Sequence, residues 1–350
     1  MTGDVSEPIA GRMRTIDIHA HYSPQCVYRA LDAGRTWHGL SLETTPEGRE
    51  YIVRGTTRKP RKPRASWNLA QHLQDMDSLG VDVHVLSAQT YLYNYDLPLE
   101  VTRATAAEIN DEIAEVSRTR PDRFAGLATL PMQDVGAAIA ELERAVGLGL
   151  KGAMIADHVN GHTYDEPAFL PFFKAAERAG ALLFFHQKGG SSLLTERAPR
   201  YHLRNTVGNP LDRALTFASL VFGGVMDACP ELKVCLAHGG GYVCYGIGRM
   251  DRGWEVRREA REHLAKPPSR YLRRFYYDCL THSEPALRFL IDSVGADRVV
   301  FGTDWPADMM LDWPVTWILS MTSLTDEEKE LILWRNLERL LDLPPAAGTS

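Results

Sequence analysis

Eight short apolar runs, spread over almost the whole chain, constrain the fold more than any other feature of this sequence. Each run is apolar throughout instead of alternating with polar residues, which is typical of parallel strands that are covered on both faces. Amphipathic stretches long enough for crossover helices lie between them, for example at residues 100–118 and 284–294. Eight strand–helix units predict an α/β fold, a (β/α)₈ TIM-type barrel, and the pattern leaves a doubly wound sheet open as the alternative. The eight runs are residues 15–20, 81–87, 124–130, 151–156, 182–186, 232–237, 275–280 and 299–302.

Two stretches interrupt this alternation, residues 22–67 and 188–209. They follow the carboxyl ends of the first and fifth predicted strands, the face where barrel enzymes build their active sites. We therefore interpret them as active-site insertions, and a surface excursion is an equally good interpretation of each. Because no internal repeat or low-complexity linker divides the chain, we expect one domain over residues 1–350.

The charge and the cysteines limit the partners that this chain can have. A formal charge of −6 offers no broad positive surface for nucleic acid, so chemistry on small molecules is expected. Residues 1–7 are acidic and polar, unlike a secretory signal, and no window approaches the ~18 apolar residues of a membrane span. Five cysteines without a Cys-x-x-Cys pair indicate buried thiols. The sequence thus predicts a cytoplasmic protein with no nucleic-acid partner and no membrane partner.

Polar side chains at the ends of three predicted strands form a candidate metal site. His19 and His21 stand two residues apart at the end of the first strand, so both side chains emerge on one side of the pleat. His186 ends the fifth strand, and Asp304 follows the eighth. If each residue is considered alone, His186 is better interpreted as a histidine of the hydrophobic core, and Asp304 could equally be the N-cap of a helix. Together, three imidazoles and one carboxylate on a shared rim suit one borderline cation such as zinc, with a position open for water.

A histidine followed by three glycines ends the sixth predicted strand. The rival interpretation of residues 238–241 is a phosphate-binding turn, because glycines let a backbone approach closely. The segment lacks both the dinucleotide fingerprint and the Lys-Ser/Thr of a P-loop. His238 is therefore a candidate general base for a metal-bound water, or a further metal ligand.

Five motifs, taken in order, resemble the amidohydrolase superfamily. More narrowly, they are similar to the branch of 2-amino-3-carboxymuconate-6-semialdehyde decarboxylase and related carboxylic-acid decarboxylases. The similarity runs from about residue 15 to about residue 342, and it implies a barrel core with these bounds. The motifs are IDIHAH at 16–21, FH at 185–186, AHGGG at 237–241, FYYD at 275–278 and FGTDWP at 301–306.

The resemblance implies roles for the residues at the strand ends. His19, His21, His186 and Asp304 match the positions that bind a single Zn²⁺, or Mn²⁺ in some members. His238 matches the histidine that activates the metal-bound water. Binuclear members use a carbamylated lysine at the end of the fourth strand, whereas Lys151 precedes the apolar core of that strand. This difference favours one ion.

Substrate-binding residues are also implied. Arg249 matches an arginine that reaches into the site of a neighbouring subunit and grips a substrate carboxylate, which implies a homodimer or a higher homo-oligomer. Without the resemblance, Arg249 reads as a surface arginine paired with Asp251. A second arginine is expected in the first insertion, where Arg61 is chosen from a cluster with Arg58 and Arg64 that also fits a solvated charge run.

Three further residues are expected beside the substrate. Tyr201 stands where the relatives most similar to this chain have a tryptophan, and Trp305 adjoins the metal-binding Asp304. His282 follows the seventh strand and lines the mouth in this interpretation, although a plain surface histidine fits equally well. The segment after Pro306 departs from the Phe-Pro usual in this branch, which indicates a changed pocket.

The predicted function is nonoxidative decarboxylation of a small unsaturated or aromatic carboxylic acid. In this scheme His238 takes the proton of a metal-bound water, and Asp304 doubles as the proton donor to carbon, a role known in some relatives. Hydrolysis of a lactone or hydration of an unsaturated dicarboxylate would use the same site. A noncatalytic metal-binding scaffold is the alternative from another class of protein.

Overall fold

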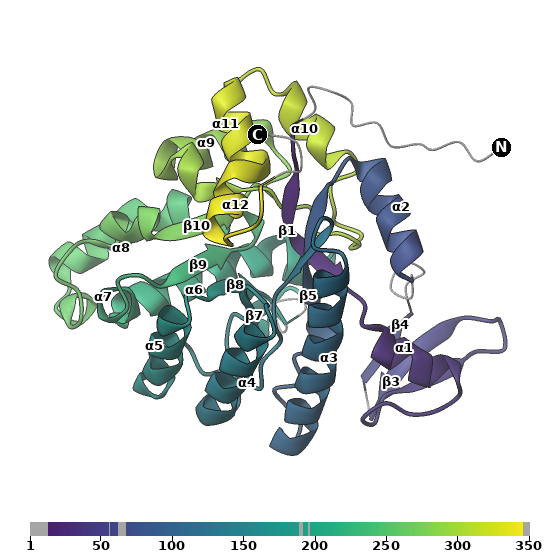
Figure 1. Ribbon diagram of the computed structural model, residues 1–350. Coiled ribbons are helices and arrows are strands. Elements are labelled where there is room, and N and C mark those ends of the chain that lie inside the picture. Colours follow the sequence, from purple (N-terminus) through teal and green to yellow (C-terminus); the bar gives the residue numbers. More distant parts are fainter. Residues whose placement is uncertain (1–12, 56, 62–67, 189–191, 195–196, 346–350) are drawn as a thin grey trace.

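Parallel strands surrounded by helices form the body of the protein (Figure 1). The structure is a computed structural model that describes residues 13–55, 57–61, 68–188, 192–194 and 197–345. The strands pair in parallel as β1-β5-β6 in a three-stranded sheet and as β7-β8-β9-β10-β11 in a five-stranded sheet. Each of the eight predicted runs coincides with one of these strands. The bounds are β1 Ile16–Tyr22, β5 Val83–Ala88, β6 Phe124–Gly126, β7 Gly152–Ala156, β8 Leu182–His186, β9 Lys233–Leu236, β10 Phe275–Asp278 and β11 Val299–Val300.

Backbone pairing joins the two sheets into one barrel. Ala128, just after β6, forms a parallel bridge with Ala153 of β7. On the opposite side, the amide of Ile18 in β1 donates a hydrogen bond of 3.0 Å to the carbonyl oxygen of Phe301, just after β11. The predicted (β/α)₈ barrel is therefore confirmed, and the doubly wound alternative is wrong. Closure brings the carboxyl ends of all these strands to one rim.

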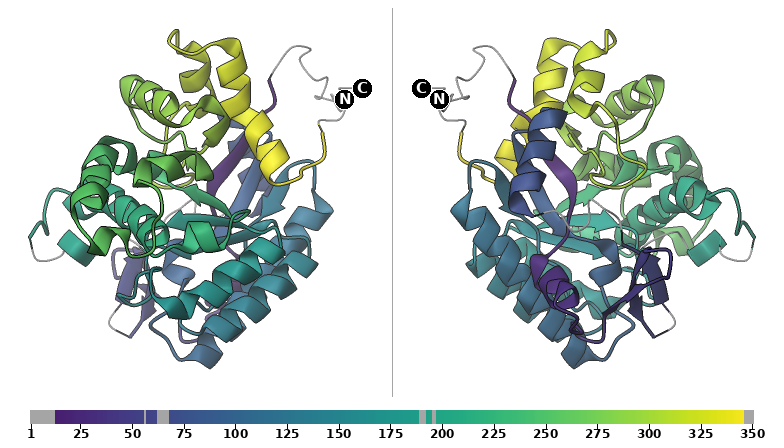
Figure 2. Two further views of the ribbon diagram at one scale, coloured as in Figure 1. Left: turned by 90° about the vertical axis from the view of Figure 1, so that its left-hand side faces the viewer. Right: turned by 90° about the vertical axis from the view of Figure 1, so that its right-hand side faces the viewer.

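Helices cover the outside of the barrel, as the two side views show (Figure 2). Helix α2 begins after Asn68, whose side chain accepts a hydrogen bond from the Gln71 amide. Thr325 caps a later helix in the same way, because its hydroxyl accepts a hydrogen bond from the Glu328 amide at 3.2 Å. Both residues satisfy amides that a helix start leaves without intrahelical partners. The helices are α1 Gln25–Asp32, α2 Leu69–Leu79, α3 Leu99–Thr119, α4 Val135–Gly147, α5 Leu170–Arg178, α6 Asn209–Phe222, α7 Val225–Ala228, α8 Val243–Val256, α9 Glu284–Val294, α10 Pro314–Ser320, α11 Asp326–Glu330 and α12 Asn336–Leu340.

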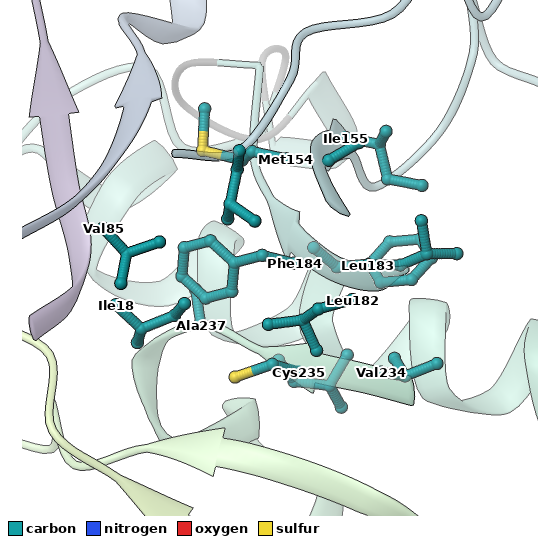
Figure 3. Close-up of a cluster of buried hydrophobic side chains, with 14 of the residues drawn as sticks. Ile18, Val85, Met154, Ile155, Leu182, Leu183, Phe184, Val234, Cys235 and Ala237 are labelled. Carbon is teal, nitrogen blue, oxygen red and sulfur yellow. The ribbon is translucent and has the colours of Figure 1, made fainter. Parts of the chain in front are cut away.

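Apolar side chains from the strands fill the inside of the barrel (Figure 3). Ile18, Val85 and Phe184 are 0% exposed. The Phe184 ring lies 5.2 Å from the ring of His19, measured between centroids, so the packed core extends to the floor of the rim. Because the interior is solid, chemistry is confined to the carboxyl rim.

The first insertion contains structure that the sequence pattern did not reveal. After α1, three antiparallel strands form a small separate sheet, β2 Ser41–Thr44, β3 Glu50–Arg54 and β4 Thr57–Pro60. Figure 1 shows this sheet beside α1 at the edge of the molecule. Apart from Ile52, the side chains described in these strands are half-buried or exposed, so no apolar run marks them.

Within the described ranges, no helix is both long and apolar enough to span a membrane.

Candidate metal centre

Four side chains from three separated segments meet at the carboxyl rim of the barrel. His19 and His21 lie on β1, His186 ends β8, and Asp304 follows β11. One ligand atom from each of these four residues lies within 4.8 Å of the others. Asp304 Oδ1 is 3.3 Å from His19 Nε2 and 3.2 Å from His21 Nε2. The structure therefore brings together the four predicted ligands.

The donor set fits a single divalent cation. All four side chains are buried. Nε2 of His186 has no hydrogen-bond partner among the residues that the structure describes, and a buried polar atom without a partner is costly. Imidazole nitrogens together with a carboxylate suit Zn²⁺ and related first-row ions. A cation held by the four groups would satisfy this nitrogen and offset the charge of Asp304.

A buried carboxylate at the end of β10, the seventh strand of the barrel, orients His19. Asp278 Oδ2 lies 2.7 Å from His19 Nδ1, which leaves Nε2 of that ring facing the other ligands. The second oxygen, Oδ1, accepts hydrogen bonds from the amides of Gly239 at 2.8 Å and Leu280 at 3.2 Å. Such a carboxylate–histidine pair sets both the tautomer and the orientation of a ligand. Asp278 has no role in the sequence-based prediction, although a carboxylate that ends an apolar strand is a usable signal.

Asp304 is positioned by the loop in which it lies. Thr303 donates through its hydroxyl to Asp17 Oδ2 at 2.6 Å, while Asp17 Oδ1 accepts from the His19 amide at 2.8 Å. Asp304 adopts a left-handed φ of 63°, which is uncommon for a residue with a side chain. The next residue, Trp305, is buried, and its ring stacks on the ring of His72 with the centroids 4.1 Å apart. One buried network thus fixes both the first strand and the Asp304 loop.

The surroundings of His19 and His238 shift the pKa values of these two histidines in opposite directions. Burial lowers the pKa of His19, but the carboxylates of Asp304 and Asp278 outweigh it and raise this pKa to about 10. The carboxylates that favour a proton on His19 also favour a cation beside it. Burial, together with positive charge on His19, lowers the pKa of His238 to about 4. His238 is therefore neutral at physiological pH and can accept a proton.

His238 lies beside the ligand group, as a general base must. Its ring centroid is 5.2 Å from that of His19 and 5.3 Å from that of His186. Its backbone has a φ of 57°, in the left-handed region that non-glycine residues rarely adopt. Strained backbone of this kind clusters at functional sites. The geometry therefore suits His238 to proton transfer next to a bound cation.

Two cavities meet at the ligand group. The first has a volume of about 480 Å³ and is lined by His21, His186 and Asp304. The second has a volume of about 850 Å³ and is lined by His238 and again by Asp304. Both volumes fall in the range of small-molecule sites, roughly 300–1,000 Å³.

Of the predicted substrate-binding residues, only His282 lines one of these two cavities. His282 lines the second cavity, whereas the Trp305 side chain is buried in the protein core. Tyr201 is 80% exposed, and Arg249 is exposed on α8; neither lines a cavity of this centre. Arg61 pairs with carboxylates of the first insertion instead, with its Nη1 2.6 Å from Asp32 Oδ1.

Arg58, the other arginine of this cluster that the structure describes, does not line either cavity. Arg58 pairs with Glu43, where its Nη2 lies 2.8 Å from Oε1. Arg64 falls outside the described residues. A different arginine, Arg204, lines the first cavity together with His21 and His186. No local pattern in the sequence marks Arg204, because its position depends on the path of the second insertion.

Comparison with known proteins agrees with this architecture. A 2-amino-3-carboxymuconate-6-semialdehyde decarboxylase of Dictyostelium discoideum is 36% identical over 80% of this chain and 78% of its own length. A gamma-resorcylate decarboxylase of Rhizobium radiobacter is 30% identical over 80% of this chain and 92% of its own length. The crystal structure of 5-carboxyvanillate decarboxylase from Sphingomonas paucimobilis superposes with a TM-score of 0.80 at 27% identity, covering 95% of this chain and all of that one.

A sequence model of one family covers nearly the whole barrel. It is the model described as amidohydrolase, and it matches residues 16–343. This range runs from the start of β1 to just beyond α12, so it includes all four candidate ligands and His238. The resemblance inferred from the motifs is confirmed, and this chain belongs to the amidohydrolase family.

Proposed function

We propose that this protein is a metal-dependent nonoxidative decarboxylase, a carbon–carbon lyase, that acts on a small aromatic or unsaturated carboxylic acid. The observation that carries the proposal is the buried group of His19, His21, His186 and Asp304, with neutral His238 beside it. The similar proteins named above are decarboxylases of unsaturated or aromatic acids.

The four ligands would hold one ion, and we propose Zn²⁺, with Mn²⁺ as the alternative. When bound, the cation supplies positive charge that stabilises the negative charge developing on substrate oxygens. The protein contributes ligands whose orientation is already set, because Asp278 fixes the His19 ring and the His186 Nδ1 contacts the Gln187 carbonyl oxygen at 3.1 Å. Ligands that are held in place lower the ordering cost of binding.

The reaction needs one proton at the carbon that loses CO₂. The bond between the carboxylate and this carbon breaks, its electron pair stays on the carbon, and a proton then adds there. Burial and His19 lower the pKa of His238 to about 4, so its ring is neutral and has a free nitrogen lone pair that can accept a proton during turnover. Burial alone would raise the pKa of Asp304, but His19 and His21 lower it well below its usual value. We propose that Asp304 receives a proton from its surroundings before it delivers one to carbon.

Carboxylate recognition by Arg249 from a neighbouring subunit is part of this proposal. Arg249 is exposed on α8, so it is available to another copy of the chain. A homodimer in which each site receives one such arginine would explain why Arg249 lines neither cavity of its own subunit. Arg61 pairs with Asp32, Trp305 packs on His72 in the core and Tyr201 is exposed, so substrate binding is not assigned to these three residues.

The decisive experiment separates loss of CO₂ from the other reactions of such a site. Purified protein loaded with Zn²⁺ or Mn²⁺ is incubated with aromatic hydroxy acids, dilactones and unsaturated dicarboxylates. Release of CO₂ and the change in substrate are then measured together. Decarboxylation predicts equal amounts of CO₂ and of the decarboxylated product. Ring opening or hydration without CO₂ would refute the decarboxylase and favour a hydrolase or a hydratase.

A further inference from the structure

Two buried histidines near the candidate metal centre have no part in the proposed chemistry. His72 lies on α2 and His84 on β5, and both side chains are buried. We propose that this histidine pair, His72 and His84, positions Asp304. Together with Asp17, the pair forms a chain of polar contacts that holds the loop on both sides of this candidate ligand. The inference rests on the proposed function for the role of Asp304 as a ligand, and it adds residues outside the ligand group on which the metal site depends.

The chain of contacts runs from an outer helix into the barrel. His72 Nε2 lies 2.9 Å from His84 Nδ1. The other ring nitrogen of His84, Nε2, lies 3.4 Å from Asp17 Oδ2, and no hydrogen bond to another described residue competes for it. A buried nitrogen without a partner is costly, so the Asp17 carboxylate is the group that His84 Nε2 is placed to contact. The histidine pair thus connects α2 with β1 through the interior.

The carboxylate of Asp17 is surrounded by hydrogen-bond donors. It accepts from the amides of His19 at 2.8 Å and of Thr303 at 3.2 Å, and from the Thr303 hydroxyl at 2.6 Å. Burial raises the pKa of Asp17 to about 6, but these donors favour its ionised form, which prevails at neutral pH. An ionised carboxylate only accepts hydrogen bonds, so it sets the direction of the contact with His84.

The tautomers of the histidine pair follow from this direction. Burial lowers the pKa of His72 to about 3 and the pKa of His84 well below its ordinary value, so each ring is neutral and carries one proton. If His84 Nε2 had no proton, its lone pair would face the Asp17 carboxylate, which is repulsive. His84 therefore carries its proton on Nε2, and its Nδ1 accepts a hydrogen bond from His72 Nε2.

Both sequence neighbours of Asp304 are anchored to this chain of contacts. Thr303 binds Asp17 through its amide and its hydroxyl. Trp305 stacks on the His72 ring with the centroids 4.1 Å apart, and its amide donates to the Thr303 hydroxyl oxygen at 3.1 Å. The left-handed φ of Asp304 is a conformation that persists only where the surroundings hold it. Anchors on both sides supply that restraint, so the histidine pair helps to set where the Asp304 carboxylate lies.

The first test determines the tautomers directly. Long-range proton–nitrogen NMR spectra of the Zn²⁺-loaded protein, labelled in histidine, show which ring nitrogen carries the proton. Both His72 and His84 should be protonated on Nε2, and Nδ1 of His84 should be unprotonated. The signals are assigned by their loss in His72→Phe and His84→Leu. A proton on Nδ1 of His84 would overturn the proposal, because His84 would then donate no hydrogen bond to Asp17.

The second test measures Zn²⁺ affinity by competition with a chelator, without any substrate. Loss of a partner that touches a ligand typically lowers metal affinity by about 10–100-fold. The histidine pair acts one contact further away, so His84→Leu should weaken Zn²⁺ binding by roughly three- to tenfold. His84→Gln, which can keep an N–H group towards Asp17, should recover most of this loss. Leu142→Ala, in the core on α4 and outside both cavities, destabilises the fold and should leave Zn²⁺ affinity unchanged.

The two histidines act as one unit, so their effects on Zn²⁺ affinity should not add. His72→Phe keeps a ring against Trp305 but removes the hydrogen bond to His84. The double variant should therefore bind Zn²⁺ about as tightly as His84→Leu alone. Additive losses would overturn the proposal, and so would a loss in His84→Leu that is no larger than in Leu142→Ala.

These measurements need no turnover, so they separate the inference from the proposed function. If the tautomers and the Zn²⁺ affinities are as expected but no acid releases CO₂, the decarboxylase proposal loses support while the positioning role stands. If CO₂ is released but His84→Leu keeps its full Zn²⁺ affinity, the positioning role fails and the proposed function stands.

Discussion

Replacement of Asp278 by asparagine should weaken metal binding without unfolding the protein. Asp278 is fully buried, and its Oδ2 lies 2.7 Å from His19 Nδ1. Asparagine can keep the oxygen that accepts from the amides of Gly239 and Leu280. The other position then becomes an amino group that points its hydrogens at His19 Nδ1. The ring must adopt the tautomer with its proton on Nε2, the atom that faces the other ligands.

The size of the effect follows from these contacts. Loss of such an orienting partner typically lowers metal affinity by about 10–100-fold, which corresponds to about 1.4–2.7 kcal/mol. Fold stability should fall by about 1–3 kcal/mol, because one buried charge-assisted hydrogen bond is lost while the two amides remain satisfied. The barrel contains many other contacts, so the variant should remain folded.

The assay is a competition titration of Zn²⁺ between the protein and a chromophoric chelator, with thermal unfolding followed in parallel. Asp312→Asn, at an exposed position outside both cavities, makes the same chemical change and should alter neither quantity. If Asp278→Asn binds Zn²⁺ as tightly as the unaltered protein, then Asp278 does not set the His19 tautomer. The account of how the site is oriented would then be refuted.

Four further outcomes are expected. His238→Gln should retain its metal while turnover falls by roughly 10² or more, and metal loss would instead identify His238 as a ligand. Arg249→Gln should raise the KM for a carboxylate substrate more than it lowers kcat, and an unchanged KM would argue against a shared site. Gly241 has a φ of 61° and no space for a Cβ, which would lie 2.1 Å from the Pro210 carbonyl oxygen. Gly241→Ala should therefore destabilise the protein by about 2–5 kcal/mol in urea unfolding, and an unchanged midpoint would contradict this packing. Removal of the metal by a chelator should abolish CO₂ release, and Zn²⁺ or Mn²⁺ should restore it; activity that persists without metal would refute the metal dependence.

Much of the metal site could be predicted because its residues lie at strand ends. An apolar run that stops at a histidine or an aspartate is visible in one dimension, as for His186 after Phe185 and for Asp304 after the eighth strand. Parallel strands in a barrel bring all such ends to one rim, so separation along the chain does not matter. The residues that orient the ligands were harder to recognise. Asp278 also ends a strand, but only its 2.7 Å contact with His19 shows what it does.

The substrate region could not be predicted in the same way. Arg61 belongs to a conspicuous basic cluster, yet it pairs with Asp32 in the first insertion. Trp305 adjoins a ligand in sequence, yet it packs into the core on His72. Arg204 begins a short π-helix, Arg204–Gly208, that no periodic pattern in the sequence marks, and it lines the first cavity. Loop paths depend on long-range contacts that local sequence does not encode.

The sequence by itself determined the barrel and the family and indicated the four candidate ligands, because hydrophobic periodicity and residue type at strand ends carry that information locally. Only the tertiary structure decided which carboxylate orients His19 and how the Asp304 loop is held. It also decided that Asp304 lines two cavities, one on the side of His21 and His186 and one on the side of His238. The physical reason is that orientation and cavity shape arise from contacts between segments far apart in the chain, as Asp278 and His19 are.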